Sequence, residues 1–170
     1  MAGDALWYEA AQVVGITNAL NVAADALGAL GPADAGASPE VRALYDEIRA
    51  FYARAEAPLS FRLIAHDPAY AADVWAATRR AFEDNRLGRR LKEALAFAVS
   101  LTTRSASGAA FHLEEMRRLG VGPRGVMEIV GVTQMFSSYT KIADTLQLEP
   151  DMGHIAPVDR TPAPGGPSPG

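Results

Sequence analysis

The chain has 170 residues, a length that fits one compact domain, and 49% of them are apolar, which is enough to bury a core. The formal net charge of −4 gives no reason to expect nucleic acid or an anionic membrane as a partner. The chain contains no cysteine, which excludes disulfides, thiolate metal sites, iron–sulfur clusters and dithiol redox chemistry within it.

Helical periodicity extends over nearly the whole sequence, and no strands are expected because period-two runs of β-branched residues are absent. The first helix is predicted over about residues 4–30, where Leu6, Val13, Leu20 and Leu27 recur every seven residues. Its start is acidic where a secretory signal would be basic, and it has no uncharged apolar stretch of about 18 residues. We therefore expect a cytoplasmic protein without a membrane partner.

Capping signals divide the middle of the chain into further helices. Ser38 and Asp67 each precede a proline, the pattern of an N-cap followed by a first-turn proline. Helices are therefore predicted from these residues to about residues 55 and 82. A short helix is predicted from Pro58, between those two, and another over about residues 87–103.

Small residues at 105–108 predict a break, followed by a helix over residues 109–119. The last helix is predicted from about Pro123 to Gln147. Residues 151–170 contain five prolines and four glycines, a composition typical of a disordered tail.

The chain contains one internal similarity. Residues 13–28 and 129–147 both begin with a β-branched residue, Val, Gly, a β-branched residue and Thr, and both end in Ala-Asp-X-Leu. One interpretation is a repeated helical unit whose first copy lacks its upstream half. The alternative is a chance match between alanine-rich helices.

Two residues are candidates for proton-transfer chemistry. His112 lies in an apolar stretch just after the small-residue segment, and Glu93 lies in a helix that is largely apolar after it. A buried carboxylate beside an imidazole is a common proton-transfer pair. The alternatives are a purely structural histidine and an i,i+4 ion pair between Glu93 and Arg89 on the helix surface. Of the other histidines, His66 is interpreted as satisfying helix ends and His154 as solvated in the tail.

Other constellations give weaker signals. Ser105 and Ser107 precede His112, but no G-x-S-x-G elbow is present to expose a nucleophile. Glu115 lies three residues after His112, the reverse of the Glu-x-x-His order of helical metal sites. We interpret residues 114–118 as a solvated, salt-bridged face. No metal site is predicted, and no phosphate-binding loop is present.

Residues 89–120 resemble the core motif of the carboxymuconolactone decarboxylase and alkylhydroperoxidase AhpD-like family. Peroxidase members of that family carry Glu, eleven residues, Cys, two residues, Cys, three residues and His. This chain has Glu93, Ser105, Gly108 and His112 at the same spacing, so both cysteines are replaced. The flanking residues 61–75 and 120–146 also resemble the family, and the resemblance covers about residues 61–150.

The resemblance implies an all-α, AhpD-like domain of about six or seven helices. It implies an N-terminal helical extension over residues 1–55 and a core over residues 56–150. Residues 13–28 of the extension would then be similar in sequence to residues 129–147, in the last helix of the core.

The resemblance also implies the function. Without thiols the dithiol peroxidase reaction cannot run, but the decarboxylase branch needs only acid–base chemistry. We therefore expect a cofactor-independent lyase or isomerase that acts on a small organic acid or carbonyl compound. Glu93 and His112 would be catalytic and lie within direct or one-water reach of each other. The small residues would leave room for substrate, and the expected pocket residues are Ser105, Gly108, Phe111 and Tyr139.

Two other readings of the resemblance stay open. The chain could be a non-catalytic binding or structural member of the family, or a peroxidase relative by ancestry only. For either an enzyme or a binding protein, the expected partners are a small-molecule ligand and further copies of the chain, as a trimer or hexamer. No metal or other cofactor is expected.

Overall fold

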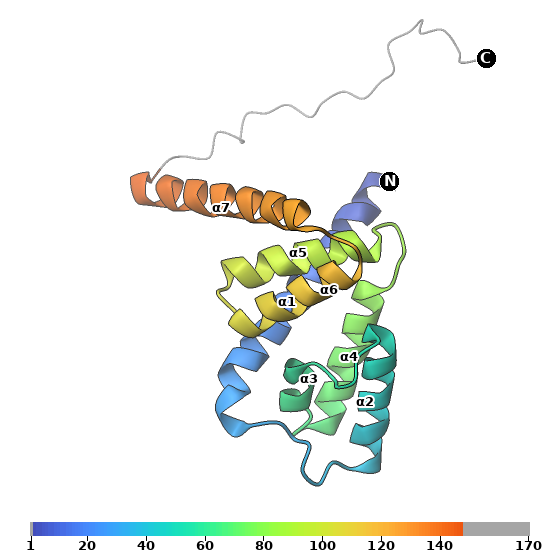
Figure 1. Ribbon diagram of the computed structural model, residues 1–170. Helices are drawn as coiled ribbons and strands as arrows, with labels where there is room; N and C mark the ends of the chain where they lie inside the picture. Colours follow the sequence, from blue (N-terminus) through green and yellow to red (C-terminus); the bar gives the residue numbers. More distant parts are fainter. Residues whose placement is uncertain (1, 148–170) are drawn as a thin grey trace, which may run out of the picture. The chain divides into compact units, whose positions relative to one another are not determined.

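The structure is a computed structural model that describes residues 2–147. Within that range the fold is all-α, with seven α-helices, one short 3-10 helix and no strand, as the sequence predicts. The elements are α1 (Ala2–Leu27), η1 (Gly28–Leu30), α2 (Pro39–Tyr52), α3 (Leu59–Ile64), α4 (Pro68–Phe82), α5 (Arg89–Thr102), α6 (Ala106–Arg118) and α7 (Pro123–Leu146) (Figure 1). The predicted tail at 151–170 and His154 lie outside the described residues.

The chain divides into two compact units, Met1–Ser137 and Ser138–Gly170, and α7 crosses the boundary between them. The first unit contains α1 to α6 and the beginning of α7, and the candidate site lies in this unit. The predicted division into an extension at 1–55 and a core at 56–150 stays a prediction.

Side-chain caps mark the starts of α2, α4 and α6. Ser38 Oγ accepts a hydrogen bond from Val41 N, and Asp67 Oδ1 accepts one from Tyr70 N, as the cap-plus-proline pattern predicts. The predicted break at 105–108 is wrong. Ser105 is itself the N-cap of α6 and accepts a hydrogen bond from Gly108 N, so the helix begins at Ala106. Arg104, with φ of 60°, makes the tight left-handed turn that allows this early start.

An aromatic cluster fills the core between α2, α3 and α4. Phe51 and Phe61 both pack edge-on against Trp75, with ring centroids 5.3 and 5.6 Å apart. Tyr52 at the end of α2 contacts Phe111 of α6 in the same edge-on manner. These contacts join the α2–α4 layer to α6, which carries His112.

Helix α1 packs against α3, α4, α5 and α6 (Figure 1). The segment 5–30 is long and apolar enough to span a membrane by length and composition alone. The search of the sequence for an uncharged apolar stretch does not identify this segment. The buried face of α1, however, includes polar side chains that bond to other helices or loops. Glu9 accepts hydrogen bonds from the backbone amides of Arg86 and Leu87, and Asn21 donates to Ser100. These contacts pack one face of α1 against the other helices, and 28% of its apolar window is buried.

Gly108 allows the close approach of α1 to the α5–α6 hairpin. A methyl group at this position would overlap the Asn21 amide oxygen and lie 2.7 Å from Ser100 Oγ. Asn21 is held there by hydrogen bonds of 3.1 Å to Ser100 Oγ and Thr103 Oγ1. The expectation that a small residue at 108 leaves free space is therefore wrong in part, because the Asn21 side chain fills the position where a larger residue would project.

This packing gives a stability prediction. Gly108→Ala is expected to lower the free energy of unfolding by about 1–3 kcal/mol, because overpacking outweighs the gain in helix propensity. The control is Gly131→Ala in α7, where nothing lies within 4 Å of the added methyl group; that change should be neutral or stabilise by up to about 1 kcal/mol. Urea denaturation measures both. Equal effects at the two positions would contradict the role of Gly108.

Candidate active site

The α5–α6 hairpin brings Glu93 and His112 together. Glu93 lies about 13.5 Å along α5 from Thr102, its last residue, and His112 about 9 Å along α6 from Ala106, its first. The early start of α6 reduces the offset between them to about 4.5 Å, which the two side chains span. His112 Nδ1 is 2.7 Å from Glu93 Oε2, and both residues are buried. The predicted direct contact is present.

The hydrogen-bond network assigns the tautomer of the neutral imidazole. Arg89 Nε donates to Glu93 Oε1 at 2.6 Å, which favours the ionised carboxylate. A carboxylate only accepts hydrogen bonds, so His112 Nδ1 carries the proton and donates. In the neutral imidazole, Nε2 is then the nitrogen that holds the lone pair. It is the nitrogen that is free to accept a proton.

Aromatic rings hold the imidazole in place. Phe82 of α4 stacks on His112 with an interplanar angle of 8°, and Phe111 contacts it edge-on at 5.1 Å between centroids. Tyr52, close by, is fully buried, and its burial raises the pKa of its hydroxyl, with the charge of Glu93 as a further cause. Tyr52 therefore stays a neutral hydrogen-bonding group at every physiological pH.

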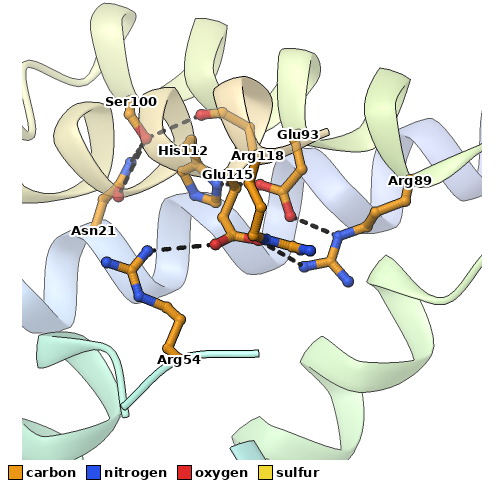
Figure 2. Close-up of polar contacts among 9 residues, drawn as sticks. Asn21, Arg54, Arg89, Glu93, Ser100, His112, Glu115 and Arg118 are labelled. Carbon is orange, nitrogen blue, oxygen red and sulfur yellow. Dashed lines mark hydrogen bonds and ion pairs between the residues drawn. The ribbon is translucent and has the colours of Figure 1, made fainter. Parts of the chain in front are cut away.

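A second buried carboxylate, Glu115, lies beside this pair (Figure 2). Its oxygens are 2.7 Å from Arg118 Nη2, 3.3 Å from Arg54 Nη1 and 3.8 Å from Arg89 Nη2. The interpretation of residues 114–118 as a solvated face is wrong for Glu115, whose side chain is 1% exposed, although it holds for Glu114 at 59%. The predicted ion pair of Glu93 with Arg89 exists, but it is buried and not on the surface.

A small pocket adjoins the imidazole. Its volume is about 90 Å³, and residues of α1, α2, α3 and α6, including His112, form its wall. Polar groups in the wall come from Asn21, Tyr52, Ser60 and Ser107. The described residues that line it include no Lys, Arg, Asp or Glu. A pocket of this size suits a compact ligand.

The four predicted pocket residues have different places. Gly108 and Phe111 line the pocket beside His112. Ser105 does not line it; its hydroxyl caps α6 and lies 3.2 Å from Asp25 Oδ1. Tyr139, whose ring is 57% exposed, belongs to the second unit, and its place in the site stays a prediction.

Sequence reasoning missed three residues of this site: Arg89 as a buried group, Glu115 and Asn21. A run of charged side chains is normally expected to be solvated. Arg89 and Glu115 lose most of their exposure only because residues from other helices pack against them, and the local sequence does not show this. Asn21 gave a usable signal, because it follows Thr17 at helical spacing on an otherwise apolar helix. His66 accords with its predicted role, since its Nε2 lies 3.0 Å from the Gly31 carbonyl oxygen at the end of η1.

The described residues contain no group of three or more His, Cys, Asp or Glu side chains arranged to hold a metal ion.

Comparisons with known proteins give a matching family model and a solved structure with a similar fold. Residues 68–148 match the model of the carboxymuconolactone decarboxylase family. The fold is similar to the crystal structure of an alkylhydroperoxidase AhpD core from Rhodospirillum rubrum, with a TM-score of 0.63 over 67% of this chain and 85% of that chain. The sequence identity is 23%, so this likeness shows the fold alone. No curated protein matches the chain.

Proposed function

The chain belongs to the carboxymuconolactone decarboxylase and AhpD-like family as a member without cysteines, and we propose that it is a cofactor-independent acid–base catalyst. His112 transfers the proton and Glu93 orients the imidazole. One observation carries the proposal. The buried His112 lines a pocket, and its Nδ1 lies 2.7 Å from Oε2 of the buried Glu93. Such a pair needs neither a thiol nor a metal to move a proton.

The proposed reaction begins with proton abstraction. His112 Nε2 takes a proton from the carbon next to a carbonyl group, and the electrons of the broken C–H bond form an enolate. Glu93, next to Nδ1, stabilises the imidazolium that results. Return of the proton to a different carbon completes an isomerisation. In a lyase reaction the enolate electrons form a C=C bond as a leaving group departs from the β carbon with its bonding pair, and His112 returns its proton to that group.

The pocket favours an uncharged carbonyl compound over an organic acid. The described residues of its wall include no lysine or arginine to pair with a carboxylate. The nearby guanidinium groups of Arg54 and Arg89 already have Glu114, Glu115 and Glu93 as partners. An unpaired ligand carboxylate in such a site would carry a desolvation cost. Hydroxyl and amide groups in the wall suit a carbonyl oxygen.

A non-catalytic binding protein is the second candidate. It is favoured by the small pocket volume and by Asn21, which fills the space in front of Gly108. The two candidates differ in one property, because a binding protein holds its ligand without exchanging the ligand's protons.

Deuterium exchange separates these candidates. The protein is incubated in D₂O with a panel of small aldehydes, ketones and lactones, and loss of the proton signal next to the carbonyl is followed by NMR. The catalyst is expected to accelerate exchange of at least one compound above the buffer rate. Line broadening of a compound without exchange would support the binding protein and contradict the catalyst. Mass spectrometry of co-purified metabolites extends the panel.

We also propose that the chain forms a homo-oligomer, a trimer or hexamer. The described residues leave large apolar side chains exposed on α1, including Trp7 and Tyr8, and on α7, including Val132 and Met135. Proteins rarely expose such faces without a partner. Light scattering is expected to give a multiple of the 18.0 kDa chain mass. A mass of one chain at micromolar concentration would contradict this prediction.

A further inference from the structure

Arg89 is a largely buried cation that contacts three aromatic rings as well as its carboxylate partner. Its guanidinium carbon lies 4.5 Å from the ring centre of Phe51, 4.9 Å from that of Tyr52 and 5.4 Å from that of Phe82, in a cage formed by α2 and α4. The side chain is only 11% exposed. Cation–π contacts are strongest where the cation is desolvated in this way. The cage fixes the position of the guanidinium independently of its carboxylate partners.

The guanidinium lies between the two buried carboxylates. Its Nε donates to Glu93 at 2.6 Å, whereas its Nη2 is 3.8 Å from Glu115 and makes no hydrogen bond within the described residues. Arg89 is thus bound tightly to Glu93 and only electrostatically to Glu115. Glu115 has Arg54 and Arg118 as further partners, but for Glu93 the described residues show no other cationic side chain within salt-bridge distance.

The charge of Arg89 decides how many protons the Glu93–His112 pair binds. With Arg89 present, a neutral imidazole and the carboxylate share one proton, which lies on Nδ1. Without it, a buried negative charge is left uncompensated beside Glu115, and binding of a second proton removes that charge. If the second proton goes to the imidazole, it occupies Nε2. If it goes to Glu93, the carboxyl group donates to Nδ1, and the imidazole proton moves to Nε2.

Both routes place a proton on Nε2 when the charge of Arg89 is absent. We therefore propose that Arg89 is a positioning residue that keeps Nε2 of His112 unprotonated and able to accept a proton. This inference rests on the proposed function for its catalytic meaning. The other charged groups around the imidazole are consistent with it. Glu115 and Arg118 on α6 pair with each other, and Arg54 pairs with Glu114 and Glu115. From α1, α2 and α4 the residues beside the imidazole are uncharged: Asn21, Tyr52 and Phe82.

Nitrogen NMR of the ligand-free protein tests this inference at neutral pH. The wild-type spectrum should show His112 with a protonated Nδ1 and a bare Nε2, and a protonated wild-type Nε2 would overturn the proposal without any variant. Arg89→Gln keeps an N–H donor but removes the charge, and it is expected to protonate Nε2 in most molecules. Arg89→Lys restores a cation and should restore much of the bare Nε2.

Arg118→Met is the matched control. It removes a cation that forms an ion pair with Glu115 and acts on Glu93 only through space, without an ion-pair contact, so Nε2 should stay bare in most molecules. A bare Nε2 in folded Arg89→Gln would overturn the proposal, as would equal protonation in Arg118→Met. Once a substrate is known, Arg89→Gln should lower kcat about tenfold or more with little change in KM, because Arg89 does not line the pocket. The spectrum needs no substrate, so a failed search for activity would contradict the proposed function and leave this test intact.

Discussion

Replacing His112 by glutamine is expected to lower the rate of proton exchange or turnover about 10²–10⁴-fold, the usual contribution of a general acid–base group. Glutamine keeps a polar side chain of similar length in the pocket wall but cannot take a proton. Glu93→Gln is expected to reduce the rate nearly as much, because an amide no longer stabilises the imidazolium. Both rates are measured by NMR in D₂O, on variants whose helical circular dichroism matches that of the wild type.

His66→Gln provides the matched control for this prediction. His66 is the other histidine within the described residues, and its ring is hydrogen-bonded to the Gly31 carbonyl on an exposed surface. Its replacement should leave the rate within about twofold of the wild type, since surface substitutions have small effects. Full activity in folded His112→Gln would exclude His112 as the proton-transfer group. In that case its contact with Glu93 would be structural.

The parts of the fold that local chemistry controls could be predicted from the sequence. Ser38 and Asp67 cap their helices through hydrogen bonds to residues three positions away, so both signals are contained in a few consecutive residues. Ser105 belongs to the same class, but small residues indicate a break as readily as a cap, and the predicted break at 105–108 is therefore wrong. The correct start of α6 is what brings His112 level with Glu93.

The burial of the charged groups could not be predicted in this way. Glu114 and Glu115 are neighbours with the same side chain, and no local feature distinguishes them. Arg54, which follows α2, and Arg89 on α5 approach Glu115 only when the helices pack. The Glu93–His112 contact could be predicted because the family resemblance implies this pairing, which helix geometry alone does not.

This neighbouring pair of glutamates gives the second large prediction. Glu115→Gln is expected to lower the free energy of unfolding by about 3–5 kcal/mol, the cost of removing one partner from a buried ion pair. Glu114→Gln should cost about 0–1 kcal/mol, as exposed pairs do. The comparison is well matched, because both carboxylates pair with Arg54 and the substitution is the same.

The difference between the two variants arises from what each carboxylate leaves behind. Loss of Glu114 leaves Arg54 paired with Glu115 and partly in water. Loss of Glu115 leaves the guanidinium of Arg89, whose side chain is only 11% exposed, with Glu93 as its only carboxylate partner among the described residues. Urea denaturation followed by circular dichroism measures both values, and light scattering confirms that the variants keep the same assembly. Equal losses would show that the Glu115 charge contributes no more to folding than a surface charge does, and the buried network would then have to be explained by its effect on His112 alone.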